Sequence, residues 1–179
     1  MYRLAILLLL LAASGCSDEP AAPAASIPHT PEFTAGSGVA FDPLINHNAT
    51  FDIDKVKRIT GNWEVELEAK GGLDIAVRSF IYEPGSFTGW HRHPGPVFIQ
   101  VLEGTVTFYE ADDPDCNPIV VPAGQSYLDL GEHAHIGRNE GTVRAKDLVV
   151  LFAPPGTPFP TGFRTDAPAP PPGQCPFEN

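Results

Sequence analysis

The chain has 179 residues, enough for one domain of ordinary size with extensions. Apolar residues make up 42% and charged residues 18%, which supports a hydrophobic core and argues against a wholly disordered chain. Twenty prolines and 17 glycines exclude a coiled coil or a protein built from long helices. Acidic residues outnumber basic ones by 22 to 11, a formal charge of -11, and no basic run exceeds two residues, so nucleic acid is not an expected partner.

The first 15 residues are typical of a secretory signal peptide. Arg3 gives a positive start, residues 4–13 are an unbroken apolar run, and small residues precede Cys16. The run is about half the length that a membrane-spanning helix needs, so a permanent span is not expected. The Ala-Ser-Gly-Cys ending resembles a bacterial lipobox, although Ala13 stands where Leu is usual. The resemblance implies lipidation of Cys16 and an exported, periplasmic or cell-envelope lipoprotein whose lipid anchor is its one membrane contact. A plain signal peptide is the alternative.

The remaining cysteines agree with export. If Cys16 carries a lipid, Cys116 and Cys175 are left as an even number of thiols in an oxidising compartment, and we expect them to form a disulfide. That bond would tie back a C-terminal tail that could not hold itself down. Two free thiols or a metal-binding pair are the alternatives, but neither cysteine has a ligand-type neighbour at short spacing.

Three regions follow the signal peptide. Residues 16–38 form a Pro/Ala-rich linker, residues 39–153 form the globular domain, and residues 154–179 form a tail with nine prolines. Within the domain, short runs with a period of two recur about every ten residues, which is typical of an all-β antiparallel sandwich or barrel. The runs predict strands over residues 63–69, 73–82, 97–102, 105–109, 119–121, 126–130, 133–137 and 143–152.

Three finer expectations follow from the strand pattern. Apolar residues alternate with glutamates from Trp63 to Leu67, which predicts a half-buried strand. Glu103-Gly104 predicts a two-residue hairpin between the flanking runs. Arg78 is interpreted as an exposed charge rather than a substrate-anchoring cation.

Four of the six histidines form two identical patterns, His91-Arg92-His93 and His133-Ala134-His135. In a strand, residues i and i+2 point to the same side, so two imidazoles can approach one ion. A pair from a neighbouring strand could complete three or four ligands, as Zn sites require. Exposed strand histidines, or a single buried one, would give the same pattern.

The surroundings of these histidines resemble the two sequence motifs of the cupin superfamily. The first motif is a Gly, five residues, His-x-His, then a Glu and a Gly, and the second is Pro-x-Gly, later His, three residues and Asn. The matching positions are Gly85, His91, His93, Gly104, Pro122, Gly124, His135 and Asn139. The resemblance implies a single jelly-roll β-barrel with Pro-rich extensions. It also implies one divalent metal ion, Fe, Zn, Cu or Ni, held by His91, His93 and His135 with His133 as an optional fourth ligand.

Two departures from the cupin motifs bear on function. Val97 stands where the family has a metal-binding Glu, and eight extra residues precede His135, so that Tyr127 occupies the usual histidine position. Neutral imidazoles alone would leave the charge of the ion uncompensated and would favour anionic ligands. The set also resembles the three-histidine, iron-containing cupin thiol dioxygenases. Alternatively, the barrel holds no metal and is a binding pocket only.

Three functions remain open from the sequence. The first is an exported cupin that binds a metal and acts on a small molecule by oxygenation, hydrolysis or isomerisation. The second is a non-catalytic envelope module for a sugar or metabolite. The third is a metal-buffering lipoprotein, for which four histidines would close the site. A homodimer is compatible with each of them.

Overall fold

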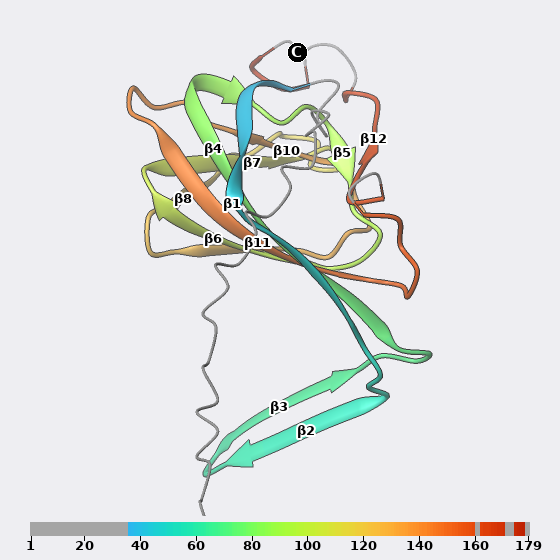
Figure 1. Cartoon of the computed structure of the whole chain (residues 1–179). Helices are drawn as coiled ribbons and strands as arrows, with labels where there is room; N and C mark the ends of the chain where they lie inside the picture. Colours follow the sequence, from blue (N-terminus) through green and yellow to red (C-terminus); the bar gives the residue numbers. More distant parts are fainter. Residues whose placement is uncertain (1–35, 160–161, 171–173, 178–179) are drawn as a thin grey trace, which may run out of the picture.

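The computed structural model describes residues 36–159, 162–170 and 174–177, and of residues 43–46 only the backbone (Figure 1). The expected signal peptide, Cys16 and nearly all of the linker lie outside the described residues. Within these ranges the chain forms strands, turns and loops, and it contains no helix long and apolar enough to cross a membrane.

Twelve strands make up the described fold. Their bounds are β1 Ser37–Phe51, β2 Lys55–Thr60, β3 Trp63–Glu68, β4 Leu73–Phe87, β5 His91–Arg92, β6 Val97–Glu103, β7 Thr105–Glu110, β8 Ile119–Pro122, β9 Ser126–Asp129, β10 His135–Arg138, β11 Ala145–Ala153 and β12 Thr165–Asp166.

Ten of these strands form one antiparallel sheet that curls into a nearly closed barrel (Figure 1). Its main path is β12-β5-β10-β4-β11-β6-β9, while β1 pairs with β4, and β7 joins β10 to β8. One side of the barrel is therefore β1-β4-β11-β6-β9 and the other is β8-β7-β10-β5-β12. The all-β barrel that the sequence predicts is confirmed, and it is consistent with a cupin jelly roll.

Period-two alternation places the core inside the barrel. Val97, Ile99 and Val101 of β6 are 4% exposed or less, whereas Phe98 and Leu102 between and after them are exposed. Alternate residues of β11 are likewise buried. Since each strand presents every second side chain to the interior, the apolar runs of the sequence fill the barrel.

The expected hairpin at Glu103-Gly104 is wrong. Strand β6 pairs with β9 and β11, whereas β7 pairs with β8 and β10, so the two strands do not pair with each other. Instead, the chain turns a corner there and passes from one side of the barrel to the other. Gly104 has φ 65°, and a Cβ at this position would lie 2.6 Å from the Arg144 carbonyl oxygen. Gly104 thus allows a tight bend between two strands that do not pair with each other. Glycine is common both in such bends and in hairpin turns, so its presence does not distinguish them.

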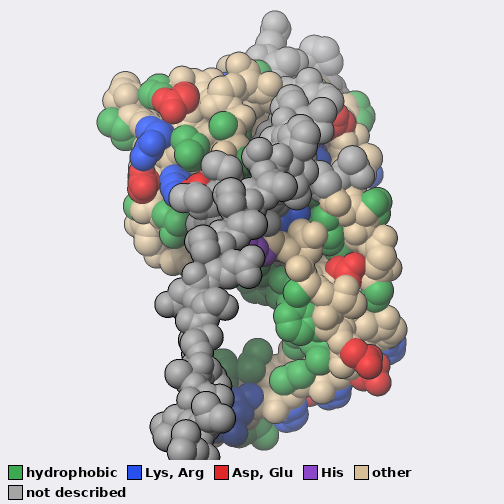
Figure 2. Space-filling view, viewed as in Figure 1, with side chains coloured by type: hydrophobic (Ala, Val, Ile, Leu, Met, Phe, Trp, Pro, Cys, Tyr) green, Lys and Arg blue, Asp and Glu red, His purple; other side chains and the backbone are tan. Residues whose placement is uncertain are grey.

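Strands β2 and β3 form a separate two-stranded sheet, residues 55–68, which we call the arm. Figure 1 shows the arm extending away from the barrel, and Figure 2 shows open space between them. The strand at Trp63 is confirmed, but its predicted half-burial is wrong, because every residue of both strands is exposed. The alternation is that of a sheet with one apolar face, and the described chain leaves this face uncovered.

Arg78 is not an exposed charge, because its side chain is 1% exposed inside the barrel. Its Nη1 donates to the His47 carbonyl at 2.9 Å and its Nη2 donates to Asn48 Oδ1 at 2.8 Å. The ring of Phe159 lies 5.5 Å from the guanidinium carbon. These groups from β1 and from the tail stabilise the buried guanidinium. They cannot be inferred from the sequence pattern of β4 alone.

Candidate metal centre

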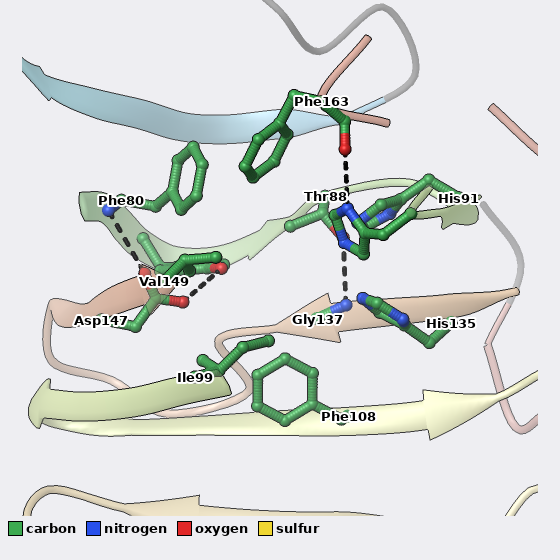
Figure 3. Close-up of a pocket in the computed structure, with 12 residues that line it drawn as sticks. Phe80, Thr88, His91, Ile99, Phe108, His135, Gly137, Asp147, Val149 and Phe163 are labelled. Carbon is green, nitrogen blue, oxygen red and sulfur yellow. Dashed lines mark hydrogen bonds between the residues drawn. The ribbon is translucent and has the colours of Figure 1, made fainter. Parts of the chain in front are cut away.

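Three histidines from two separate stretches of the chain meet inside the barrel (Figure 3). Antiparallel pairing of β5 with β10 sets His135 directly opposite His91, and His93 follows at the end of β5. One ligand atom from each ring lies within 4.8 Å of the others, and the ring centroids are 4.5–5.2 Å apart. All three side chains are buried. This cluster could hold a metal ion.

The contacts of the Nδ1 atoms orient the three rings. His91 Nδ1 lies 2.8 Å from the Gly89 carbonyl oxygen, and His93 Nδ1 lies 2.8 Å from the Phe163 carbonyl oxygen. A carbonyl can only accept, so both Nδ1 atoms carry the proton of the neutral ring. Each Nε2 then has a free lone pair. Histidine ligands in metal sites are oriented by the same kind of contact.

Burial keeps the imidazoles of His91 and His93 neutral. It lowers the pKa of His91 well below its ordinary value, and the neighbouring His135 and His93 lower it further. Burial, together with His135, also lowers the pKa of His93 to about 3. Both rings are therefore unprotonated at neutral pH, which is the state that binds a metal ion.

Asp129 approaches the cluster from behind His135, and sequence reasoning missed it. Its Oδ2 lies 3.3 Å from His135 Nδ1, a contact distance at an angle outside hydrogen-bond geometry, and the carboxylate is 3% exposed. Burial opposes its ionisation, but His135 and the Gly131 N–H outweigh burial and lower the Asp129 pKa. The carboxylate is opposite Val97 in the β6–β9 register. The Asp129 carboxylate thus lies beside the position where the cupin motif has Glu. It contacts the His135 ring from the side away from the other two imidazoles.

His133 does not join the cluster. Its side chain is 54% exposed, and its Nδ1 lies 3.1 Å from Asp112 Oδ2. The i, i+2 argument assumes a regular strand, but β10 begins at His135 and the residues before it are bends. The histidine pattern at 133–135 therefore places one ring inside the barrel and the other in solvent.

The cluster borders a cavity of about 20 Å³. This volume accommodates a group of about the size of one water molecule. The aromatic rings of Phe80, Phe108 and Phe163 line it together with Thr88 and Ile99 (Figure 3). The closed site has room for an ion and a very small ligand. A larger ligand requires one of these side chains to move.

Asp147 and Tyr82 form a second polar group in the same cavity, and sequence reasoning missed Asp147. The Tyr82 hydroxyl donates to Asp147 Oδ2 at 2.9 Å, and the Phe80 N–H donates to Oδ1 at 3.2 Å. Burial raises the pKa of Asp147 from 3.8 to about 7. A carboxyl that holds its proton near neutral pH can give or take one within the cavity, at the end away from the histidines (Figure 3).

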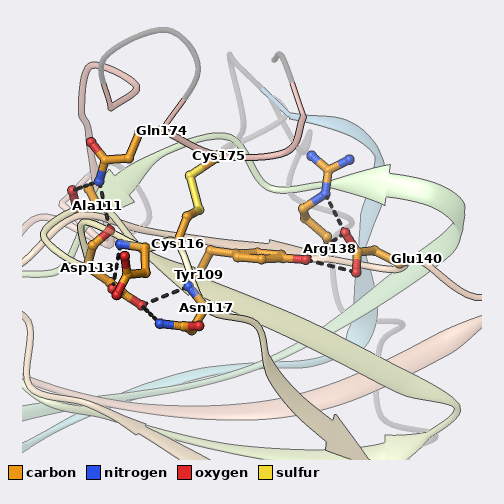
Figure 4. Close-up of a disulfide and its surroundings, with 10 residues drawn as sticks. Tyr109, Ala111, Asp113, Cys116, Asn117, Arg138, Glu140, Gln174 and Cys175 are labelled. Carbon is orange, nitrogen blue, oxygen red and sulfur yellow. Dashed lines mark hydrogen bonds and ion pairs between the residues drawn. A yellow bond between two sulfur atoms is a disulfide. The ribbon is translucent and has the colours of Figure 1, made fainter.

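The C-terminal tail covers this end of the barrel. Phe163 lines the cavity and bonds His93, while Arg164 Nη1 donates to the Thr88 carbonyl at 2.7 Å. Strand β12 pairs with β5 beside His91. Farther along, Cys175 is bonded to Cys116, as the sequence predicts (Figure 4). Residues that follow the barrel in sequence are thus part of the site.

The comparisons agree with this architecture. Residues 78–152, less than half of the chain, match the family model of the cupin domain. No curated protein matches the chain. Among solved structures, oxalate oxidase in complex with the substrate analogue glycolate is 21% identical with a TM-score of 0.40, over 45% of this chain and 42% of that one. The chain thus spans less than half of that protein.

Two further solved structures have similarly low sequence identities and TM-scores. A conserved protein of unknown function from Streptococcus pyogenes is 20% identical, with a TM-score of 0.39 over 45% of this chain and 65% of that one. A cupin superfamily protein from Desulfitobacterium hafniense DCB-2 is 12% identical, with a TM-score of 0.39 over 55% and 75%.

Fold and site together define an antiparallel β-barrel with a buried histidine cluster at one end. Residues 78–152 of this barrel are similar to the cupin domain. The three histidines of the cluster lie within this matched range, whereas the tail that covers them lies outside it.

Replacement of Asp147 by Asn should alter the pH dependence of stability. Between about pH 4 and pH 7 the folded carboxyl keeps a proton that the unfolded chain has lost, so the stability of the wild type falls as pH rises through this window. The loss amounts to at most about 4 kcal/mol, and Asp147→Asn should remove it. Urea unfolding of both proteins from pH 4 to pH 8 measures the difference. Parallel stability curves would contradict the buried carboxyl.

Removal of the disulfide should destabilise the protein. Cys116 and Cys175 are 59 residues apart, and in the chain-entropy model a loop of that length contributes about 4 kcal/mol. We expect the double variant Cys116→Ala, Cys175→Ala to lose about this much free energy of unfolding, measured with urea under oxidising conditions. Reducing agent should destabilise the wild type and leave the variant unchanged. Equal stability of the oxidised wild type and the variant would contradict the prediction.

Proposed function

We propose that the protein is a metalloprotein that binds one divalent transition metal ion through Nε2 of His91, His93 and His135. The observation that carries the proposal is the orientation of the rings: two carbonyls accept from Nδ1 of His91 and His93, and the Asp129 carboxylate lies 3.3 Å from Nδ1 of His135. Three buried imidazoles form a donor set that Zn, Fe, Cu and Ni accept. The identity of the ion is left to measurement.

We further propose that the centre acts on a small, preferably anionic, molecule. Three protein ligands leave a coordination position open, which is typical of catalytic sites, and a bound ion would supply Lewis acidity or activate water or dioxygen. With His133 in solvent, the closed four-histidine site of a metal buffer has no support. Because imidazole ligands are uncharged, the charge of a bound ion would attract an anion to the site, while the nearby Asp129 carboxylate would limit the excess positive charge.

This chain's own residues supply the remaining functions of a reaction site. Asp147, bonded to the Tyr82 hydroxyl, is the proton-holding group of the cavity. The rings that line the cavity exclude water and thereby strengthen electrostatic interactions within it. Phe163 couples the tail to the site through its carbonyl on His93. An envelope module that binds a metabolite without reaction is the alternative, and a substrate screen of the metal-loaded protein distinguishes the two.

The metal proposal predicts about one equivalent of transition metal in freshly purified protein. The double variant His91→Ala, His93→Ala should lose it, because one imidazole cannot hold the ion at the site. His133→Ala is the matched control, and it should keep the full equivalent, since this ring lies in solvent. Elemental analysis gives the stoichiometry. The proposal would be contradicted by wild-type protein that is metal-free and binds none of the added ions Zn²⁺, Fe²⁺, Cu²⁺ and Ni²⁺.

Asp129→Asn should weaken metal binding without abolishing it. Loss of an outer-shell carboxylate typically costs 10–100-fold in affinity, because the imidazole becomes less basic and less well oriented. Competition with a chromophoric chelator measures the change in Kd. We expect Asp113→Asn, at an exposed turn outside the cluster, to leave the Kd unchanged. An unaltered Kd in Asp129→Asn would remove Asp129 from the centre.

We also propose that the protein is exported and anchored by a lipid on Cys16. The support is the sequence of residues 1–16, together with a disulfide that suits an oxidising compartment. Growth with labelled palmitate should label the protein, and Cys16→Ala should lose the label. Labelling that persists in Cys16→Ala, or its absence from exported wild type, would contradict the anchor.

A further inference from the structure

The arm has one apolar face. In the β2–β3 register, Val56 is opposite Leu67, Arg58 is opposite Val65 and Thr60 is opposite Trp63, so these six positions share one face, which is apolar apart from Arg58 and Thr60. The four apolar side chains on this face are between 39% and 58% exposed. From Trp63 to Leu67 the strand advances about 13 Å. An isolated two-stranded hairpin is marginally stable in water, and a contiguous exposed apolar face of this kind marks an interaction site.

The other face of the arm carries five charged side chains and one exposed apolar one, Ile59. Lys55 Nζ lies 2.7 Å from Glu66 Oε1, and Lys57 Nζ lies 2.7 Å from Glu64 Oε1. These ion pairs suit a solvent-facing side. The arm therefore has the pattern of a sheet that packs against another surface on one side only. The side that is expected to pack is its apolar face.

A second apolar surface lies on the outside of the barrel. Across the neighbouring strands β4, β11, β6 and β9, the register places Val77, Val150, Phe98 and Leu128 in one row. All four point out of the barrel; Phe98 is 51% and Leu128 48% exposed. Phe152 extends the row, with its ring 5.4 Å from that of Phe98. Three strand spacings make the row about 14 Å long, close to the length of the apolar face of the arm. We call these four residues the outer row.

The arm and the outer row of one chain lie apart. The arm continues from β1 and β4, which belong to the same sheet as the outer row, and Figure 1 shows it extending away from the barrel. In Figure 2, hydrophobic side chains of the arm border the open space beside the barrel. Two copies related by a twofold axis would allow each arm to cover the outer row of the other. Such an arrangement buries both surfaces twice and closes on itself.

We propose that the chain forms a homodimer by arm exchange, in which the apolar face of each arm packs on the outer row of the second copy. The occupant is a second copy because the chain carries both halves of the contact, matched in length and apolar character. Packing of an amphipathic sheet on the apolar outside of another sheet also removes the exposed aromatic and aliphatic side chains from water. This inference is independent of the metal centre.

Analytical ultracentrifugation of the wild type and of single variants tests the dimer. Trp63→Glu on the arm and Phe98→Glu on the outer row should each weaken dimerisation at least about 30-fold. Glu64→Gln, next to Trp63 but on the charged face, is the matched control and should leave the dimer intact. Each variant should keep the wild-type far-ultraviolet circular dichroism and the Cys116–Cys175 bond, since the replaced Trp63 and Phe98 side chains are exposed.

A mixture of the two variants tests the exchange itself. The Phe98→Glu chain has an intact arm and the Trp63→Glu chain has an intact outer row, so a mixed dimer keeps one of the two contacts. Differently tagged variants should therefore associate more tightly than either variant associates with itself. If the arms packed on each other, the mixture would gain nothing, and that result would overturn the exchange.

Two other outcomes would also overturn the proposal. The first is wild type that stays monomeric at roughly 100 µM, well above the micromolar range of specific dimers. The second is monomeric wild type that sediments with phosphatidylcholine–phosphatidylglycerol vesicles and loses this binding in Trp63→Glu. The apolar face would then contact a lipid surface and not a second copy.

Discussion

The candidate centre depends on the antiparallel pairing of β5 with β10. This pairing sets His135 opposite His91 and brings the two histidine stretches, more than 40 residues apart in the sequence, to one end of the barrel. A shift of one residue would turn His135 out of the interior, because side chains alternate along a strand. The register is held on both sides, by the β10–β7 ladder and by the β5–β12 pair. The precision of the site therefore derives from backbone hydrogen bonds rather than from the imidazoles.

Groups outside the cluster determine what the imidazoles can do. Gly89 and Phe163 accept from Nδ1 of two rings, and Asp129 lies against the third. Val97 stands where the cupin motif has Glu, and the Asp129 carboxylate of the neighbouring strand lies opposite it, behind the ring of His135. An ion held by these three imidazoles would therefore have an anion nearby that does not occupy a coordination position. This arrangement would leave room for an anionic ligand beside the ion.

Much of the fold is readable from the sequence, because it depends on local alternation. The strands over residues 73–82 and 97–102 follow from period-two patterns, and both lie where they are expected. Pairing partners are not local, so the corner at Gly104 looks like a hairpin. The burial of Arg78 was missed for the same reason, since its partners come from β1 and the tail.

The candidate site was predictable to the same extent. His91, His93 and His135 stand in motif spacing, so sequence reasoning identifies them. His133 was included because the rule for side-chain direction was applied before the start of β10 was known. Asp129 and Asp147 sit in ordinary strand patterns, and only the fold shows that their carboxylates face the cavity end of the barrel. Two-residue spacing is thus a reliable guide within a strand and fails at its ends.

The position of Phe163 changes what counts as the unit that folds and functions here. The family match ends at residue 152, and motif reasoning places the end of the domain at residue 153. Yet the ring and carbonyl of residue 163 complete the wall around the histidines, and the covalent link at Cys175 fastens the segment to the barrel. A fragment cut at the motif boundary would leave the imidazole of His93 without its acceptor and the interior open to solvent. At its C-terminal end the cooperative structural unit therefore extends more than twenty residues beyond the matched range, from residue 152 to Cys175.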